Sequence, residues 1–176
     1  KTNILGTKNV ASSVANFFKK KNLNIKLVFM SSDGVYPSTK GNYKESDKLK
    51  PYNYYGLTKL EGEKIVKKLN DFIIIRTRFF DKNNIKFRYA ATNIFTSSIE
   101  VNKLSLYIYK IIKKKFKGII NVGGKKVSDY KKYKKYKKNI KPCDKTVIFN
   151  STNVKLASDA SLNLKKFNRL IWNTPR

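Results

Sequence analysis

The chain has 176 residues, with 40 lysines and arginines against 11 aspartates and glutamates, a formal net charge of +29 and no histidine. Its single cysteine, Cys143, excludes a disulfide within the chain, and we expect a reducing, cytoplasmic compartment. One cysteine without histidine cannot supply the usual zinc ligands, so no metal is expected. No apolar run is long enough to suggest a membrane span.

The first expected elements are a helix over residues 3–20 and a strand over residues 26–30. The helix is indicated by apolar side chains at helical spacing, at Ile4, Val10, Val14 and Phe18. The strand is a short apolar run that small and polar residues end at Ser31 and Ser32. Ligands of open α/β sheets bind at the carboxyl ends of strands, so a serine hydroxyl there could bond a substrate oxygen.

A second helix is expected over residues 53–69, carrying Tyr55 and Lys59 four positions apart on one face. An ammonium beside a phenol favours the phenolate and lowers the tyrosine pKa from its usual value of about 10. Such a tyrosine can exchange a proton with a carbonyl or alcohol oxygen. The same spacing also fits an exposed helix face in a chain rich in lysine and tyrosine, and the upstream strand end favours the catalytic interpretation.

Strand and helix patterns then alternate, as parallel α/β sheets require. We expect a buried strand at 71–76, an irregular segment at 81–98, a helix at 101–116, a strand at 118–122 and a last helix at 164–171, capped by Asn163.

The segment 131–138 interleaves lysines with tyrosines, a pattern that can bind single-stranded nucleic acid. It is also typical of an exposed helix that starts after Ser128 as N-cap. The positive charge is nearly all lysine, and Asn, Ile, Phe and Tyr are also frequent, a composition that an AT-rich genome imposes on any protein. We favour the second interpretation and expect no specific nucleic acid, although the positive potential would help gather an anionic substrate.

Several motifs, in this order and spacing, resemble the extended short-chain dehydrogenase/reductase family, which belongs to the NAD-dependent epimerase/dehydratase superfamily. Within it the chain is most similar to dTDP-4-dehydrorhamnose reductases and their relatives. The resemblance is close over the first third of the chain and weaker at residues 75–77, 118–124 and 161–163. The motifs are Asn3-x-x-Gly6-Thr7-x-Asn9-Val10, Ser31-Ser32-Asp33-x-Val35-Tyr36, Gly41-Asn42-Tyr43-Lys44-Glu45-Ser46-Asp47 and Tyr55-Gly56-x-Thr58-Lys59-Leu60-x-Gly62-Glu63.

The resemblance implies catalytic roles for three residues. Tyr55 would be the acid/base, Lys59 would hold the nicotinamide ribose and tune Tyr55, and Ser32 would hold the substrate oxygen. Ser31 is the adjacent alternative to Ser32 and is expected to fill the strand end. Asn3 matches the family's helix asparagine, which either takes part directly or fixes the helix through a polar bond.

The resemblance also suggests binding residues further along the chain. Arg78 lies in a loop after a strand, where family members contact the cofactor or substrate. Lys86 and Arg88 are candidates to bind the substrate diphosphate through charge-assisted hydrogen bonds.

The implied function is reduction of a 4-keto nucleotide-linked deoxysugar by NAD(P)H, with a homodimer possible. The alternatives are a nucleotide-sugar epimerase of the same superfamily and a non-catalytic remnant. The family's 4,6-dehydratases carry an acidic pair after the catalytic threonine, whereas Gly34 follows Asp33 here, which argues against dehydration.

The expected fold class is α/β: the carboxyl-terminal portion of a Rossmann-like, doubly wound parallel sheet with a small substrate-binding lobe. Residues 1–80 would form part of the NAD(P)-binding domain, and residues 81–176 the lobe and the remaining Rossmann elements. The glycine-rich turn that holds the dinucleotide is missing, because Gly123-Gly124 comes late and lacks the third glycine. We therefore expect a fragment or a natural truncation, with an uncovered sheet edge and weak folding or poor solubility.

Overall fold

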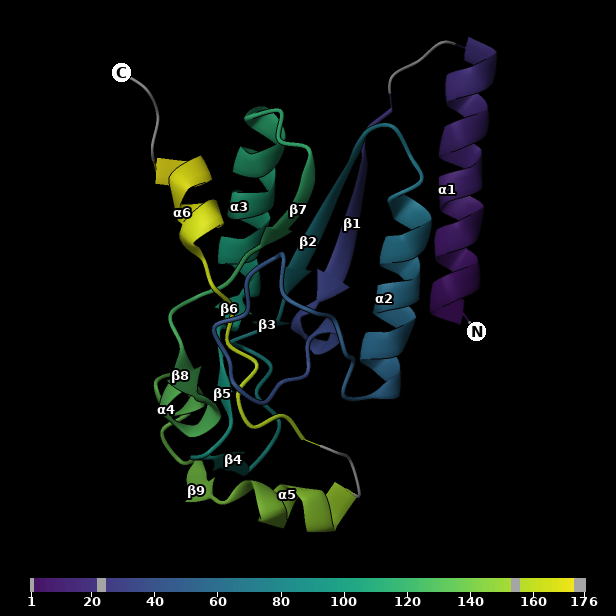
Figure 1. Ribbon diagram of the computed structural model, residues 1–176. Coiled ribbons are helices and arrows are strands. Elements are labelled where there is room, and N and C mark those ends of the chain that lie inside the picture. Colours follow the sequence, from purple (N-terminus) through teal and green to yellow (C-terminus); the bar gives the residue numbers. More distant parts are fainter. Residues whose placement is uncertain (1, 22–24, 153–155, 173–176) are drawn as a thin grey trace.

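A computed structural model of the chain describes residues 2–21, 25–152 and 156–172. Its centre is a three-stranded parallel sheet in the order β1-β2-β7, with helices on both faces (Figure 1). The strands are β1 (Leu27–Ser32), β2 (Phe72–Thr77) and β7 (Gly118–Asn121). The helices around the sheet are α1 (Thr2–Lys21), α2 (Tyr54–Val66), α3 (Val101–Lys113) and α6 (Lys165–Trp172). This is the expected α/β class, a partial Rossmann-like fold.

A lobe of short elements lies beyond the carboxyl ends of these strands (Figure 1). Three two-stranded ladders, β3-β6, β4-β9 and β5-β8, build it. They comprise β3 (Phe79–Phe80), β4 (Tyr89–Ala91), β5 (Phe95–Thr96), β6 (Ile99–Glu100), β8 (Val127–Ser128) and β9 (Lys141–Cys143), with helices α4 (Asp129–Lys134) and α5 (Lys145–Thr152). The segment 81–98, expected to be irregular, therefore contains β4 and β5.

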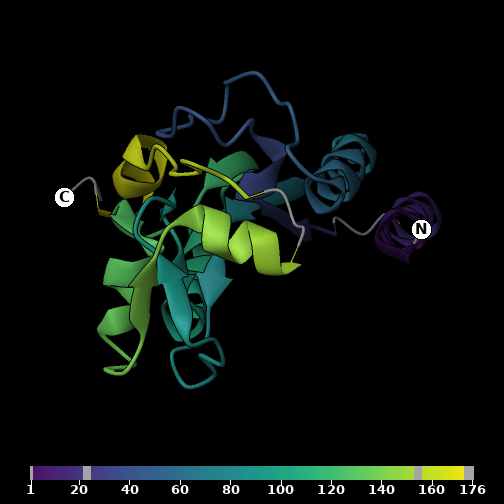
Figure 2. The same ribbon diagram turned by 90° about the horizontal axis from the view of Figure 1, so that it is seen from below.

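The first helix occurs where it was expected, but its apolar face is only partly used. Ala11 is buried, whereas Val10 is 52% exposed. In both views α1 stands outermost, beside α2 and away from β2 (Figures 1 and 2). Asn3 Nδ2 of α1 donates to Thr58 Oγ1 of α2 at 3.3 Å. Because α1 packs against α2 and not against the sheet, only a narrow stripe of its side chains is buried.

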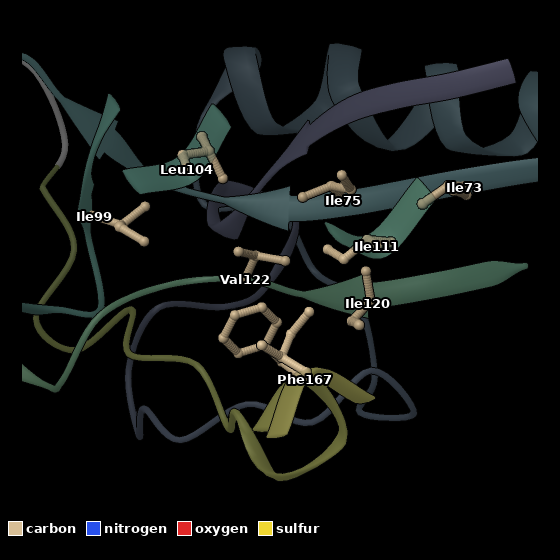
Figure 3. Packing of buried hydrophobic residues seen from close by; sticks show 9 residues of the cluster. Ile73, Ile75, Ile99, Leu104, Ile111, Ile120, Val122 and Phe167 are labelled. Carbon is tan, nitrogen blue, oxygen red and sulfur yellow. The ribbon is translucent and has the colours of Figure 1, made fainter. Parts of the chain in front are cut away.

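An apolar cluster fills the space between the sheet and the pair α3 and α6 (Figure 3). Its residues come from strands, helices and the turn after β7, and include Ile73, Ile75, Ile99, Leu104, Ile111, Ile120, Val122, Phe167 and Ile171. Side chains of β2 are buried on both faces, as expected for an inner parallel strand. β1 ends the order of the described sheet. Beside it a recess opens between Leu27–Phe29 and one face of α1.

A buried ion pair ties α2 to β2 on the other side of the sheet. The Arg76 guanidinium is 1% exposed, and its Nε and Nη2 donate to the Glu63 carboxylate oxygens at 2.9 and 2.7 Å. Ser31 Oγ donates to the same carboxylate at 2.6 Å. A third guanidinium nitrogen, Nη1, donates to Tyr36 Oη at 2.8 Å and to the Glu45 carbonyl at 3.1 Å. One arginine therefore joins strand, helix and the loop that follows β1.

That loop is further fixed by Asn121 at the end of β7. Asn121 Oδ1 accepts from Tyr36 Oη at 3.0 Å, and Nδ2 donates to the Tyr43 carbonyl at 2.8 Å. The rings of Tyr36 and Tyr43 stack, with centroids 4.8 Å apart and planes 8° apart. The Asn121 backbone N–H donates to Glu45 Oε1 at 2.9 Å. Residues 33–52 therefore have little regular structure and yet are held by buried bonds.

Two glycines bring this loop against the start of α2. A Cβ built on Gly56 would lie 2.1 Å from the Gly34 carbonyl oxygen. Only a residue without a side chain allows this approach.

We predict that Gly56→Ala lowers the free energy of unfolding by about 1–3 kcal/mol or more, since backbone would have to move. Gly6→Ala is the matched control, because Gly6 is also helical and a Cβ there would meet nothing within 4 Å. That change should be neutral or stabilising by up to about 1 kcal/mol. Urea unfolding of both variants provides the measurement, and equal effects would contradict the contact.

We predict that Glu63→Ala costs about 3–5 kcal/mol, because Arg76 would remain buried without its counter-charge. Glu61 on the same helix forms an exposed pair with Lys64, so Glu61→Ala should change the free energy of unfolding by less than about 1 kcal/mol. Similar losses in the two variants, measured by denaturant unfolding, would show that the buried pair has no special weight.

Candidate active site

Ser32 lies at the carboxyl end of β1, opposite Thr77 of β2, and is 8% exposed. Its Oγ caps the short helical turn η1 (Asp33–Val35) by accepting from the Gly34 N–H at 3.0 Å. The hydroxyl donates to Asp33 Oδ1 at 3.3 Å. Ser31, the adjacent alternative, gives its hydroxyl to Glu63 inside the protein. Ser31 thus fills the strand end, and Ser32 is the serine nearer the loop.

Tyr55 stands in the first turn of α2, where Asn53 is the N-cap and accepts from the Gly56 N–H. Its side chain is 52% exposed, on the rim of a recess lined by Thr2, Asn3, Tyr54 and Thr58. Burial of the remainder raises its pKa above the usual value, the Asp33 carboxylate raises it further, and Arg78 lowers it.

The expectation that Lys59 lowers the Tyr55 pKa is not met. Lys59 Nζ donates to the Met30 carbonyl at 2.9 Å. It lies 5.8 Å from the centroid of the Tyr55 ring, above the ring. Burial lowers the pKa of Lys59 itself. Burial is the largest cause of the raised Tyr55 pKa, and Asp33 and Arg78 act on it with opposite signs.

Arg78, the residue expected to contact the cofactor, lies directly after β2. Its Nε is 2.7 Å from Asp33 Oδ2, and its Nη2 donates to Tyr52 Oη at 3.0 Å. Burial raises the pKa of Asp33 and Arg78 opposes that rise, while Asp33 in turn raises the pKa of Arg78. The two groups form a largely buried ion pair beside Ser32.

Asn3 supports the helix-fixing interpretation of its motif. Its amide donates to Thr58 Oγ1, and the Thr58 hydroxyl donates to the Tyr55 carbonyl at 2.8 Å. Asn3 thereby braces the turn that carries Tyr55.

Lys86 and Arg88 are exposed, in a segment anchored by Lys137 Nζ, which donates to the carbonyls of Ile85 and Phe87. Arg88 lies over the Tyr89 ring, 6.0 Å from its centroid. Among the described residues, no recorded bond joins Lys86 or Arg88 to Ser32, Tyr55 or Lys59.

Sequence reasoning missed Lys132. Ser128 caps α4 as expected, but the helix ends at Lys134, and Lys132 is 5% exposed instead of facing solvent. Its ammonium donates to Thr96 Oγ1 and to Asp129 Oδ1, the latter at 2.9 Å. The Lys132 charge also lowers the pKa of Asp33. The available signal was Asp129, an acidic residue three positions earlier in a lysine-rich run.

The described residues include a polar group that suits the amide of a nicotinamide, but no turn that suits the phosphates of a dinucleotide. Thr77 Oγ1 is buried at the end of β2 with no hydrogen-bond partner among them, next to Ser32, and could serve a bound amide. Gly123 and Gly124, by contrast, pack against Ser97 and Ser98, and Gly124 N–H donates to the Ser97 carbonyl. They do not form a phosphate-binding turn.

Residues 2–21, 25–152 and 156–172 include no helix that is long and apolar enough to cross a membrane. They also contain no group of three or more aspartate, glutamate, histidine or cysteine side chains placed to hold a metal ion.

The parallel sheet, with serine, tyrosine and lysine at the end of β1 and on the following helix, defines the Rossmann-like short-chain dehydrogenase/reductase class. Residues 1–97, more than half of the chain, match the model of the RmlD substrate binding domain family, and the chain belongs to that family.

Solved structures of this class share the fold. A hypothetical dTDP-4-dehydrorhamnose reductase from Sulfolobus tokodaii is 27% identical, with a TM-score of 0.75 over 95% of this chain and 65% of that one. The Bacillus anthracis dTDP-4-dehydrorhamnose reductase in complex with NADP is 23% identical, with a TM-score of 0.74 over 94% and 65%. The B. anthracis dTDP-glucose 4,6-dehydratase in complex with NAD is 18% identical, with a TM-score of 0.74 over 99% and 63%.

A curated relative matches a short stretch. Methionine adenosyltransferase 2 subunit beta from Bos taurus is 52% identical over 40 residues, which are 23% of this chain and 12% of that protein. The chain thus spans about two thirds of the similar reductases and a small part of this relative.

We predict that Tyr55 titrates above pH 10, the ordinary range of tyrosine, because burial and Asp33 outweigh Arg78. Carbon-13 NMR of ring-labelled tyrosine follows the titration, with Tyr55→Phe to assign the signal. A Tyr55 midpoint well below pH 10 would contradict this prediction and support the expectation from the sequence that Lys59 lowers the Tyr55 pKa.

Proposed function

We propose that the site reduces a 4-keto group on a nucleotide-linked deoxysugar with NAD(P)H. The observation that supports this most is the Gly34–Gly56 contact, which brings the end of β1, with Ser32, against the turn that carries Tyr55. Family membership and the similarity to the Sulfolobus tokodaii reductase support the same reaction class.

Each residue would have one task. The nicotinamide, when bound, supplies a hydride to the carbonyl carbon. Tyr55 gives its proton to the carbonyl oxygen, and as a phenol it carries that proton at neutral pH. Ser32 bonds that oxygen, and Lys59, placed over the Tyr55 ring, holds the ribose of the cofactor.

Reduction is favoured over dehydration by the surroundings of Gly34. This residue is buried, and a Cβ built on it would meet Ser32 Oγ at 3.3 Å, Gly56 Cα at 3.6 Å and Tyr52 Cε1 at 3.7 Å. Position 34 offers no carboxylate, and the neighbouring Asp33 is paired with Arg78. An acid to assist a departing hydroxyl is therefore lacking at this position.

The remaining assignments belong to the same proposal. Residues 1–80 form part of the NAD(P)-binding domain, and residues 81–176 hold the substrate lobe and later Rossmann elements. Arg78 lies on the cofactor side, Lys86 and Arg88 bind the substrate diphosphate, no nucleic acid is a specific partner, and the protein can form a homodimer.

Two rivals remain. An epimerase would use the same three residues and return the hydride, so it would consume no NAD(P)H. A non-catalytic binding subunit is favoured by one observation: the Tyr55 pKa is raised, by burial and by Asp33, instead of being lowered toward neutral pH. The match to a protein named as a subunit agrees with that rival.

The test supplies NADPH or NADH with a dTDP-linked 4-keto-6-deoxysugar and follows nicotinamide absorbance. We predict net oxidation by the wild-type chain and a loss of about 10²–10⁴-fold for Tyr55→Phe. The neighbouring Tyr54, 70% exposed, gives the matched control Tyr54→Phe, which should keep the wild-type rate. Sugar inversion without oxidation would favour the epimerase, and no reaction at all would favour the binding subunit. Near-normal turnover by Tyr55→Phe would remove Tyr55 from the reaction.

A further inference from the structure

We propose that the Asp33–Arg78 ion pair is the positioning device of this site: Asp33 holds the Ser32 hydroxyl by a hydrogen bond and acts on the Tyr55 phenol by its charge, while Arg78 balances that charge. This inference deepens the proposed function and rests on it for its catalytic meaning. Its physical content, the coupling of the ion pair to Tyr55, is independent of any reaction.

The pair is built into the fold from two strands. Asp33 follows β1 and is 1% exposed, and Arg78 follows β2. Their charged atoms are 2.7 Å apart, and Tyr52 Oη accepts from Arg78 Nη2 at 3.0 Å. A carboxylate this buried needs a counter-charge, and Arg78 provides the nearest one.

Asp33 touches the first hydroxyl of the site directly. Its Oδ1 accepts the Ser32 hydroxyl at 3.3 Å, while Ser32 Oγ accepts from the Gly34 N–H. The Ser32 side chain is therefore fixed from two sides. A substrate oxygen that took the Ser32 hydrogen would have to draw it away from Asp33.

Asp33 and Tyr55 each precede a glycine of the contact between the loop and α2. Gly34 follows Asp33, Gly56 follows Tyr55, and the backbones of these glycines are in contact. The contact therefore brings the backbone of Asp33 to the turn that carries Tyr55. Burial raises the Tyr55 pKa, the Asp33 carboxylate raises it further, and Arg78 lowers it.

Other charges near Tyr55 are placed differently. Lys59, on the same helix, lies over the ring with its ammonium on the Met30 carbonyl. Lys132, from α4, acts on Asp33 and Arg78. Tyr55 is 52% exposed, and burial of its remainder is the largest cause of its raised pKa, to which Asp33 adds and which Arg78 opposes.

The experiment compares Tyr55 titrations by carbon-13 NMR in Asp33→Asn, Arg78→Gln, the double variant and wild type. In the alkaline range where Tyr55 titrates, Asp33 is ionised. Asp33→Asn should therefore lower the Tyr55 midpoint by about 0.5–1 pH unit, and Arg78→Gln should raise it by a similar amount. The double variant should return toward wild type, and Arg78→Lys, which keeps the charge, should restore most of the effect.

Asp47→Asn is the matched control, because Asp47 pairs with Lys40 at the exposed surface and should leave Tyr55 unchanged. If Arg78→Gln fails to fold, Asp33→Asn and Arg78→Lys still test the inference, because Asn keeps the size of the aspartate side chain and Lys keeps the positive charge of arginine. Tyr55 midpoints that shift in opposite directions in Asp33→Asn and Arg78→Gln would support the role of the ion pair even if the protein shows no turnover. A lack of turnover would then refute only the proposed reaction. A Tyr55 midpoint that is the same in wild type and Asp33→Asn would overturn the inference.

Discussion

One buried guanidinium organises this protein. Arg76 satisfies its charge on Glu63 of α2 and gives its remaining donor to Tyr36 and the Glu45 carbonyl in the loop after β1. A buried charge without partners would cost several kcal/mol, so strand, helix and loop must be in register before Arg76 can be buried. That register sets where the loop lies relative to the first turn of α2, and therefore which side chains meet at the sheet end.

The site follows from this arrangement. The loop brings Asp33 and Gly34 to α2, and the absence of a side chain on Gly56 completes the approach. Ser32 is held by its hydrogen bond to Asp33, and Lys59 by its hydrogen bond to the Met30 carbonyl. The chain belongs to the RmlD substrate binding domain family and spans about two thirds of the similar reductases.

Sequence patterns predicted the fold class, the family and the central elements, because apolar runs and motif order encode them. Sequence patterns gave wrong predictions where tertiary contacts decide whether a side chain is buried. Val10 fits an apolar stripe but is exposed, since α1 meets α2 alone. Lys132 belongs to a lysine-rich run that is typical of an exposed helix, but it is buried because its ammonium donates to Asp129 and Thr96. The direction of the Tyr55 pKa depends on burial and on Asp33, which the folded loop brings close to α2, so the Tyr55–Lys59 spacing could not tell it. The roles of Ser32, Tyr55, Lys59 and the other site residues remain proposals.

The most direct test of the central claim is native-state hydrogen exchange of the loop after β1. The amides of Tyr36, Tyr43 and Lys50 donate to the Asp33, Ser161 and Val35 carbonyls and belong to no long strand. If the Arg76 cluster holds this loop, these amides exchange with opening free energies close to those of β2. Exchange at the rate of an exposed turn, while β2 stays protected, would contradict the account.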